Sequence, residues 1–124
     1  MQDMPQSKEI VEVVGEFLRQ HVIPNLEGHT AFHALVAANA LDIVKRELEI
    51  APQANEEELS RLQTLLDKNG TLEQLNRELC DRIQSGDITL ETPGFADHLW
   101  QSTLTKLAID QPKYSGYRRA EGKI

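Results

Sequence analysis

The sequence has one cysteine, few aromatic residues and no long apolar run, and each scarcity excludes a class of protein. Cys80 is the only cysteine, so the chain cannot form an internal disulfide, which fits a reducing cytoplasm. Aromatic residues make up 5% of the chain, so Leu, Val and Ile must supply most of the core. No apolar run approaches the ~20 residues of a membrane span, and MQDMPQSKE does not resemble a signal peptide. We therefore expect a cytoplasmic protein.

Basic residues are outnumbered, with 13 Lys and Arg against 20 Asp and Glu, which gives a formal charge of −7. Nucleic acids and anionic membranes bind basic surfaces, so the sequence predicts neither as a partner. Residues 113–124 nevertheless carry four basic residues and one acidic residue, or +3, which leaves −7 − 3 = −10 on residues 1–112. We predict a single helical domain over 1–112 and a basic tail over 113–124. The tail is either a solvated end or a segment that docks on the acidic body of the same or a neighbouring subunit.

Apolar residues repeat with helical spacing along the chain, and the longest such pattern covers residues 29–50. At about 100° per residue, Phe32, Val36 and Ile43 lie on one line, and further apolar residues widen the arc to roughly half of the helix surface. Such a helix must be covered on two sides. The sequence thus predicts an all-α fold, a compact bundle of about five helices around this central helix.

The first helix is predicted to begin at the capping residue Ser7 and to bury one apolar stripe. Within that stripe His21 is expected to point inward as a neutral side chain, with a catalytic base as the alternative. Gly15 costs up to ~1 kcal/mol in a helix interior and is expected to mark a close helix crossing. The predicted stripe comprises Ile10, Val13, Val14, Phe17, Leu18 and Val22.

Capping signals place the other boundaries. Pro52 is predicted to end the central helix, after which Asn55 and Glu58 form a capping box for a third helix that ends at Asn69 and Gly70. A second capping box, Thr71 with Gln74, starts a fourth helix that Ser85 and Gly86 close and that packs antiparallel to the third. The last helix is predicted to begin at Thr92 and Pro93 and to end before Pro112.

Polar residues within these apolar patterns are the candidate ligand-binding residues. Buried amides need partners, so Asn39 and Asn76 would bond each other, cap a backbone group or receive a ligand. Lys106 shares the apolar line of the last helix, so its ammonium must reach solvent or pair with an acid such as Glu47. The candidates are His33, Asn39, Glu47, Asn76 and Lys106.

No catalytic or metal-binding motif accompanies these residues. His29 and His33 have the i, i+4 spacing of two metal ligands, but Thr30 follows His29 where zinc proteases have Glu, and no third ligand lies at motif distance. Cys80 has no cation or helix N-terminus near it in the predicted pattern, so it is interpreted as a small apolar residue. We predict no metal, no cofactor and no identifiable catalytic residue.

Four segments resemble one bacterial family of unknown function, DUF6285: MQDMPQSKEIVEVVGEFL, FHALVAANALDIVKRELE, LNRELCDRI and LTKLAIDQPKYSGY. The resemblance covers nearly the whole chain and brings no established activity. Members of this family are often encoded beside phosphotransferases that resemble aminoglycoside kinases and beside acyl-CoA dehydrogenase-like enzymes. The resemblance therefore implies a link to acyl-CoA or small-molecule catabolism.

Two functional hypotheses follow. The first is a non-catalytic accessory module that binds a kinase-like or acyl-CoA-metabolising enzyme, or a second copy of itself. The alternative is a helical bundle that binds or converts a small, acyl-type molecule with polar residues in its core. The two differ in geometry, because the second requires the candidate side chains to converge on one cavity.

Overall fold

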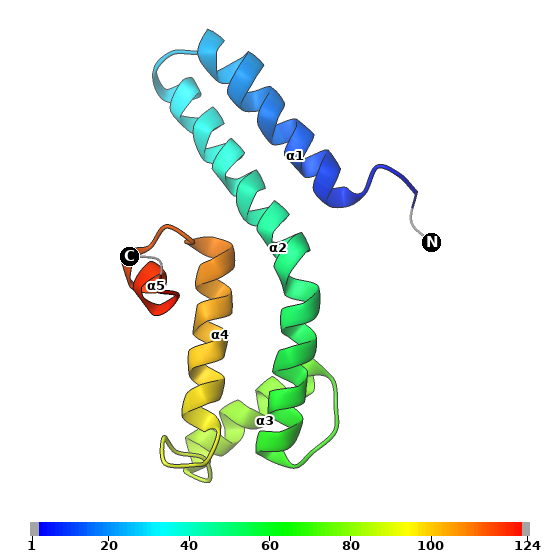
Figure 1. The fold of residues 1–124 in the computed structure, drawn as a ribbon, viewed down its shortest axis with the longest axis vertical. Helices are drawn as coiled ribbons and strands as arrows, with labels where there is room; N and C mark the ends of the chain where they lie inside the picture. Colours follow the sequence, from blue (N-terminus) through cyan, green and yellow to red (C-terminus); the bar gives the residue numbers. More distant parts are fainter. Residues whose placement is uncertain (1–2, 123–124) are drawn as a thin grey trace. The chain divides into compact units, whose positions relative to one another are not determined.

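The computed structural model describes residues 3–122, which contain five α-helices and no β-strand (Figure 1). The predicted all-α fold around a long central helix is confirmed. The chain divides into two compact units at the bond between Ala51 and Pro52, and each unit is described separately. The α-helices are α1 (Ser7–Phe17), α2 (Gly28–Leu66), α3 (Leu72–Ser85), α4 (Phe95–Asp110) and α5 (Ser115–Ala120). A π-helix, η1 (Leu18–Val22), and a 3₁₀-helix, η2 (Ile23–Asn25), connect α1 to α2.

Helix α2 is much longer than the sequence predicted. Pro52 lies inside the helix, so the predictions of an end there and of a capping box at Asn55 are wrong. Glu58 is not a capping residue, since its carboxylate accepts a hydrogen bond from the Asn76 amide at 2.9 Å. The proline ring removes one backbone donor, but the residues after it are mostly strong helix formers, so the helix resumes its pattern.

The first unit is a helical hairpin in which α1 lies beside the first part of α2 (Figure 1). Ser7 is the first residue of α1, so the predicted cap is displaced by one position to Gln6, whose N–H donates to Glu9 at 2.7 Å. Gly15 is buried, and a Cβ built on it would lie 4.0 Å from the Leu41 Cβ. The close crossing expected at Gly15 is therefore present.

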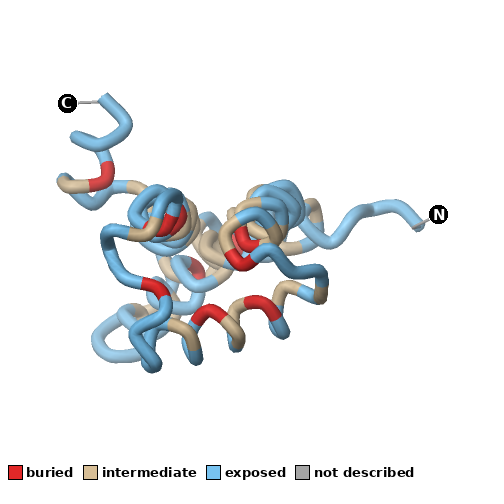
Figure 2. Tube along the Cα trace, turned by 90° about the horizontal axis from the view of Figure 1, so that it is seen from below, coloured by how far each residue is buried: buried red, intermediate tan, exposed pale blue. Residues whose placement is uncertain are grey.

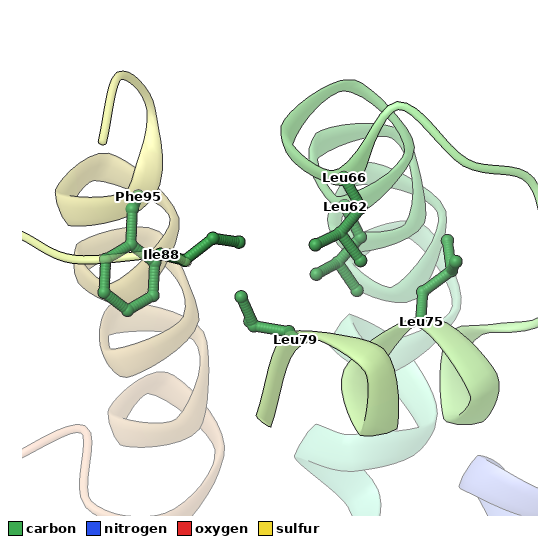
Figure 3. Close-up of a cluster of buried hydrophobic side chains, with 6 residues drawn as sticks. All are labelled: Leu62, Leu66, Leu75, Leu79, Ile88 and Phe95. Carbon is green, nitrogen blue, oxygen red and sulfur yellow. The ribbon is translucent and has the colours of Figure 1, made fainter. Parts of the chain in front are cut away.

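The second unit contains the apolar core of the molecule. Leu62 and Leu66 of α2 meet α3, the connector before α4, and the first residue of α4 (Figure 3). Figure 1 shows α3 running across the end of α2. The sequence predicted that α3 would lie antiparallel beside the preceding helix, so this prediction is wrong. Figure 2 shows the buried positions of α3 on one side of that helix. The core residues are Leu62, Leu66, Leu75, Leu79, Ile88 and Phe95.

The helix ends in this unit agree in part with the capping signals. The Thr71 and Gln74 capping box is confirmed, with reciprocal bonds of 2.9 and 3.2 Å, and Gly86 ends α3 in the left-handed conformation. The end of α2 differs, because Asp67, not Gly70, takes the positive φ, at 48°. Helix α4 begins two residues later than predicted, at Phe95 after the left-handed cap Gly94.

Part of the predicted basic tail is ordered as α5, which contacts α4. Tyr117 of α5 is 8% exposed and is the only buried residue of this helix. Lys123 and Ile124 lie outside the described residues. The domain boundary at residue 112 stays a prediction.

Candidate functional site

The apolar stripe of α1 is exposed, although the sequence predicted that it would be buried. Val13 is 63% exposed and Phe17 is 55% exposed, and Ile10 and Val14 are also exposed. Helix α1 turns a different side, centred on Gly15, toward α2. One neighbouring helix covers only one side of a rod, so most of the predicted stripe finds no cover within its own unit.

The two edges of this hairpin differ in chemistry. Two ion pairs join α1 or η1 to α2 on one edge: Arg19 with Asp42 at 2.7 Å, and Lys45 with Glu12 at 2.6 Å. Arg19 also donates to the Asn39 side chain at 3.0 Å. These bonds fix which sides of the two helices share the polar edge.

The opposite edge is apolar. At about 100° per residue, the exposed stripe of α1 lies on the side away from Arg19 and Glu12, and Val44 and Leu48 lie on the corresponding side of α2. Both α2 side chains are about 40% exposed. We call Ile10, Val14, Phe17, Val44 and Leu48 the apolar face of the hairpin.

A cavity of about 310 Å³ adjoins the start of α1, and Leu48 belongs to its lining. The other lining residues are mostly polar: Asp3, Pro5, Gln6, Ser7 and Lys8. None of the candidate ligand-binding residues from the sequence lines this cavity.

Three candidate residues belong to the first unit, and their role in ligand binding stays a prediction. Asn39 is exposed and bonded to Arg19. His33 is exposed beside Phe32, with ring centroids 5.7 Å apart, and Glu47 is exposed. His21, predicted to point inward, is exposed as well, since it follows the exposed α1 stripe around the helix.

The other two candidates belong to the second unit. Asn76 is half-buried, and its amide donates to Glu58 and to the Leu72 carbonyl at 3.1 Å, so it has its own partners. Lys106 is exposed. Because Glu47 and Lys106 belong to different units, their pairing stays a prediction. Cys80 is exposed as a free thiol.

Within residues 3–122, no three His, Cys, Asp or Glu side chains come together in a group that could hold a metal ion. In the same range, no helix has an apolar stretch long enough to cross a bilayer.

The sequence analysis missed a buried polar cluster in the second unit. His98 of α4 is 3% exposed, and its Nδ1 has no hydrogen-bond partner among the described residues. The buried Arg61 Nε and Ser102 Oγ likewise find no partner in the described part of the chain. The helical spacing in the sequence could have indicated this group, because His98 and Ser102 follow Phe95 at i+3 and i+7 and so share its core-facing side.

Arg61 acts electrostatically on His98. Burial lowers the pKa of His98, and the positive charge of Arg61 lowers it further, while Glu58 and Asp97 act in the opposite direction. Arg61 also lines a shallow groove of about 220 Å³ with Ser60, Thr64, Leu65, Gly94 and Asp97. Of the three residues, Arg61 thus borders a surface groove between α2 and the start of α4.

Comparison with known proteins gives one match. A family model described as a domain of unknown function, DUF6285, matches residues 24–114, which span α2, α3 and α4. No curated protein and no solved structure matches the chain. Because the family model covers well over half of the 124 residues, the chain belongs to the DUF6285 family.

Proposed function

We propose that this protein is a non-catalytic interaction module that binds another protein through the apolar face of its α1/α2 hairpin. The exposure of Phe17 and its neighbours carries the proposal. Apolar side chains scattered singly over a surface need no explanation, whereas a contiguous group along two packed helices is typical of an interaction site.

The size of the face suits such a role. With about 150–250 Å² for each large side chain, its five residues leave on the order of 400 Å² of apolar surface uncovered. A standard interface buries about 800 Å² on each partner, of which roughly 60% is apolar. The face, together with the small and polar residues around it, supplies an area of this order.

The polar edge of the hairpin supports the same use. Arg19 with Asp42 and Lys45 with Glu12 hold the two helices together from the side opposite the apolar face. The hairpin can therefore present its apolar face as a surface already formed before binding, which lowers the entropy cost of association. A helix from another protein would pack along the apolar face.

The proposed partner is a cytoplasmic enzyme, either a phosphotransferase of the kinase-like type or an acyl-CoA-metabolising enzyme. This choice rests on the resemblance to DUF6285, whose members are often encoded beside such enzymes. A second copy of this chain is the alternative partner, because two hairpins packed by their apolar faces would make a four-helix bundle.

Affinity capture from the native cells tests the proposal. Tagged wild-type protein should retain a kinase-like or acyl-CoA-metabolising enzyme in stoichiometric amount, and Phe17→Glu should lose it, because the change places a charge on the apolar face. Gln101→Glu, which adds the same charge to an exposed position of α4, is the matched control and should retain the partner.

Circular dichroism should show equal helix content for all three proteins. Equal retention of the enzyme by wild type and Phe17→Glu would refute the apolar face as the binding surface. Recovery of the wild-type protein without any enzyme, as a dimer, would identify the second copy as the partner.

A further inference from the structure

We propose that Arg61, His98 and Ser102 form a binding site for one small oxyanion, such as a carboxylate, which enters from the groove beside Ser60 and Gly94. The site lies in the second unit and is independent of the interaction proposed for the α1/α2 hairpin.

The three side chains offer complementary donors. Arg61 Nε carries a hydrogen, the Ser102 hydroxyl can donate, and an imidazole can donate from Nδ1. Each of these atoms is buried without a hydrogen-bond partner among residues 3–122. A buried polar atom without a partner is destabilising. Arg61 acts electrostatically on His98, and Ser102 follows His98 by one turn of α4, so we place one shared acceptor among the three side chains. An oxyanion has enough lone pairs to accept from all three.

Other polar side chains of this unit do have hydrogen-bond partners within it. Asn76 donates to both Glu58 and a backbone carbonyl. Thr103, the residue after Ser102, donates to the Leu99 carbonyl of its own helix at 2.8 Å. Ser102 lies in the same helix and makes no such bond to any described residue. Its hydroxyl therefore remains available to a ligand.

The charges around His98 restrict the ligand. Arg61 is the cation nearby, while Glu58 and Asp97 are anions that act on the same imidazole. The Glu58 carboxylate is already engaged by Asn76. Two carboxylates would repel a dianion more strongly than a monoanion, so the site favours a singly charged carboxylate over a phosphate-like group. The adjoining core residue Phe95 keeps the surroundings apolar, which strengthens each charge-assisted bond.

The groove supplies a route and a size limit. Arg61 belongs to its lining and also carries one of the three buried atoms, so we place the entrance to the site at this side chain. Its volume of about 220 Å³ admits a small molecule but lies below the usual range of about 300–1,000 Å³ for drug-sized ligands. Ser60 and Thr64 place further hydroxyl groups along this route.

NMR titration of the imidazole of His98 tests the site, with sodium acetate and sodium sulfate as probes and sodium chloride at equal ionic strength as the reference. A bound anion stabilises the imidazolium, so acetate should raise the pKa of His98 in a saturable manner above its value in chloride. His21, His29 and His33 are exposed and serve as internal references that should not respond.

Arg61→Gln should weaken the apparent binding of acetate at least tenfold, since it removes a charge-assisted donor. Arg77→Gln removes the same charge from an exposed position of α3 and should bind acetate as the wild type does. Arg61→Lys keeps the charge but lacks the Nε donor, so it should also bind more weakly, and it replaces Arg61→Gln if that variant loses helix content.

The results with the two probes distinguish two chemical classes of ligand. A response to acetate that requires Arg61 supports a carboxylate ligand, and a response to sulfate that requires Arg61 supports a tetrahedral oxyanion. No response of His98 beyond that in chloride, or an equal response in Arg61→Gln, would overturn the proposal.

Discussion

His98 is a polar residue buried in the second unit. The side chain is 3% exposed, lies one turn beyond Phe95 of the core and has an unpaired Nδ1 in the described structure. Burial first, and then the charge of Arg61, lower its pKa, so the folded protein favours the neutral form of this imidazole more than the unfolded chain does. Residues of this kind are candidates for function as well as for pH sensitivity.

We therefore expect the free energy of unfolding to depend on pH through His98. Its pKa in the folded protein lies below the ordinary value of 6.5, so the unfolded chain binds the proton more readily. The contribution of His98 is fully present above about pH 6.5 and is lost as the pH falls through its folded pKa. Urea denaturation between pH 7.5 and 5 should thus show decreasing stability.

The control is His98→Gln, which keeps a polar side chain but cannot titrate in this range. Its unfolding free energy should fall less than that of the wild type between the same two pH values. Equal pH dependence in both proteins would assign the effect to other groups.

Gly15 provides a second test at the level of one residue. A Cβ at this position would lie 3.7 Å from Arg19 Nη1 and 4.0 Å from the Leu41 Cβ, which are ordinary contacts. Gly15→Ala should therefore raise the unfolding free energy by about 0.5–1 kcal/mol, because alanine is the better helix former. A Cβ at Gly116 would lie 2.6 Å from the ring of Tyr114, which is an exposed side chain, so Gly116→Ala should displace that ring and change the unfolding free energy less than Gly15→Ala does. Chemical denaturation measures both, and a loss of stability in Gly15→Ala would contradict the geometry of the crossing.

At the level of elements, α2 is the unusual feature, since it continues through Pro52. Proline inside a helix removes one hydrogen bond and crowds the carbonyl four residues earlier, here that of Leu48. The helical residues on both sides of Pro52 must outweigh this cost for the helix to continue.

Pro52→Ala should consequently stabilise the protein by about 1–3 kcal/mol, because it restores the N–H donor and removes the steric conflict. Thermal unfolding followed by circular dichroism at 222 nm would show a higher midpoint with no loss of helix signal. A lower midpoint would mean that the proline conformation is required at this position.

Local signals in the sequence were sufficient for some elements and not for others. Thr71 and Gln74 bond each other within one turn, so a sequence pattern alone could predict the start of α3. Pro52 was misleading because continuation of a helix through proline depends on the residues flanking it. The stripe of α1 was correctly seen as apolar, but its burial depends on what covers it, which periodicity does not specify.

The same limit applied to the candidate sites. Asn39 and Asn76 were chosen as polar residues within apolar patterns, and each has partners in its own unit. His98 was overlooked because a single histidine in a helix is inconspicuous, and only the burial of its side chain without a partner distinguishes it.

At the level of the whole molecule, the two units differ in how their apolar residues are used. The second unit closes a core around Leu62 and Leu75, which are almost fully buried. In the first unit the buried residues are small, Gly15 and Ala38, while larger ones such as Phe17 remain exposed. This contrast is why we assign partner binding to the first unit and ligand binding to the second.

Site-specific photo-crosslinking in the native cells tests the central claim most directly. A photoreactive phenylalanine derivative at position 17 should give an adduct with a second protein, whereas the same group at position 101 should not. We expect mass spectrometry to find a peptide of that second protein joined to residue 17. A crosslink from position 17 to residues 52–122 of the same chain, or no adduct beyond that at position 101, would contradict the assignment of the apolar face as a protein-binding surface.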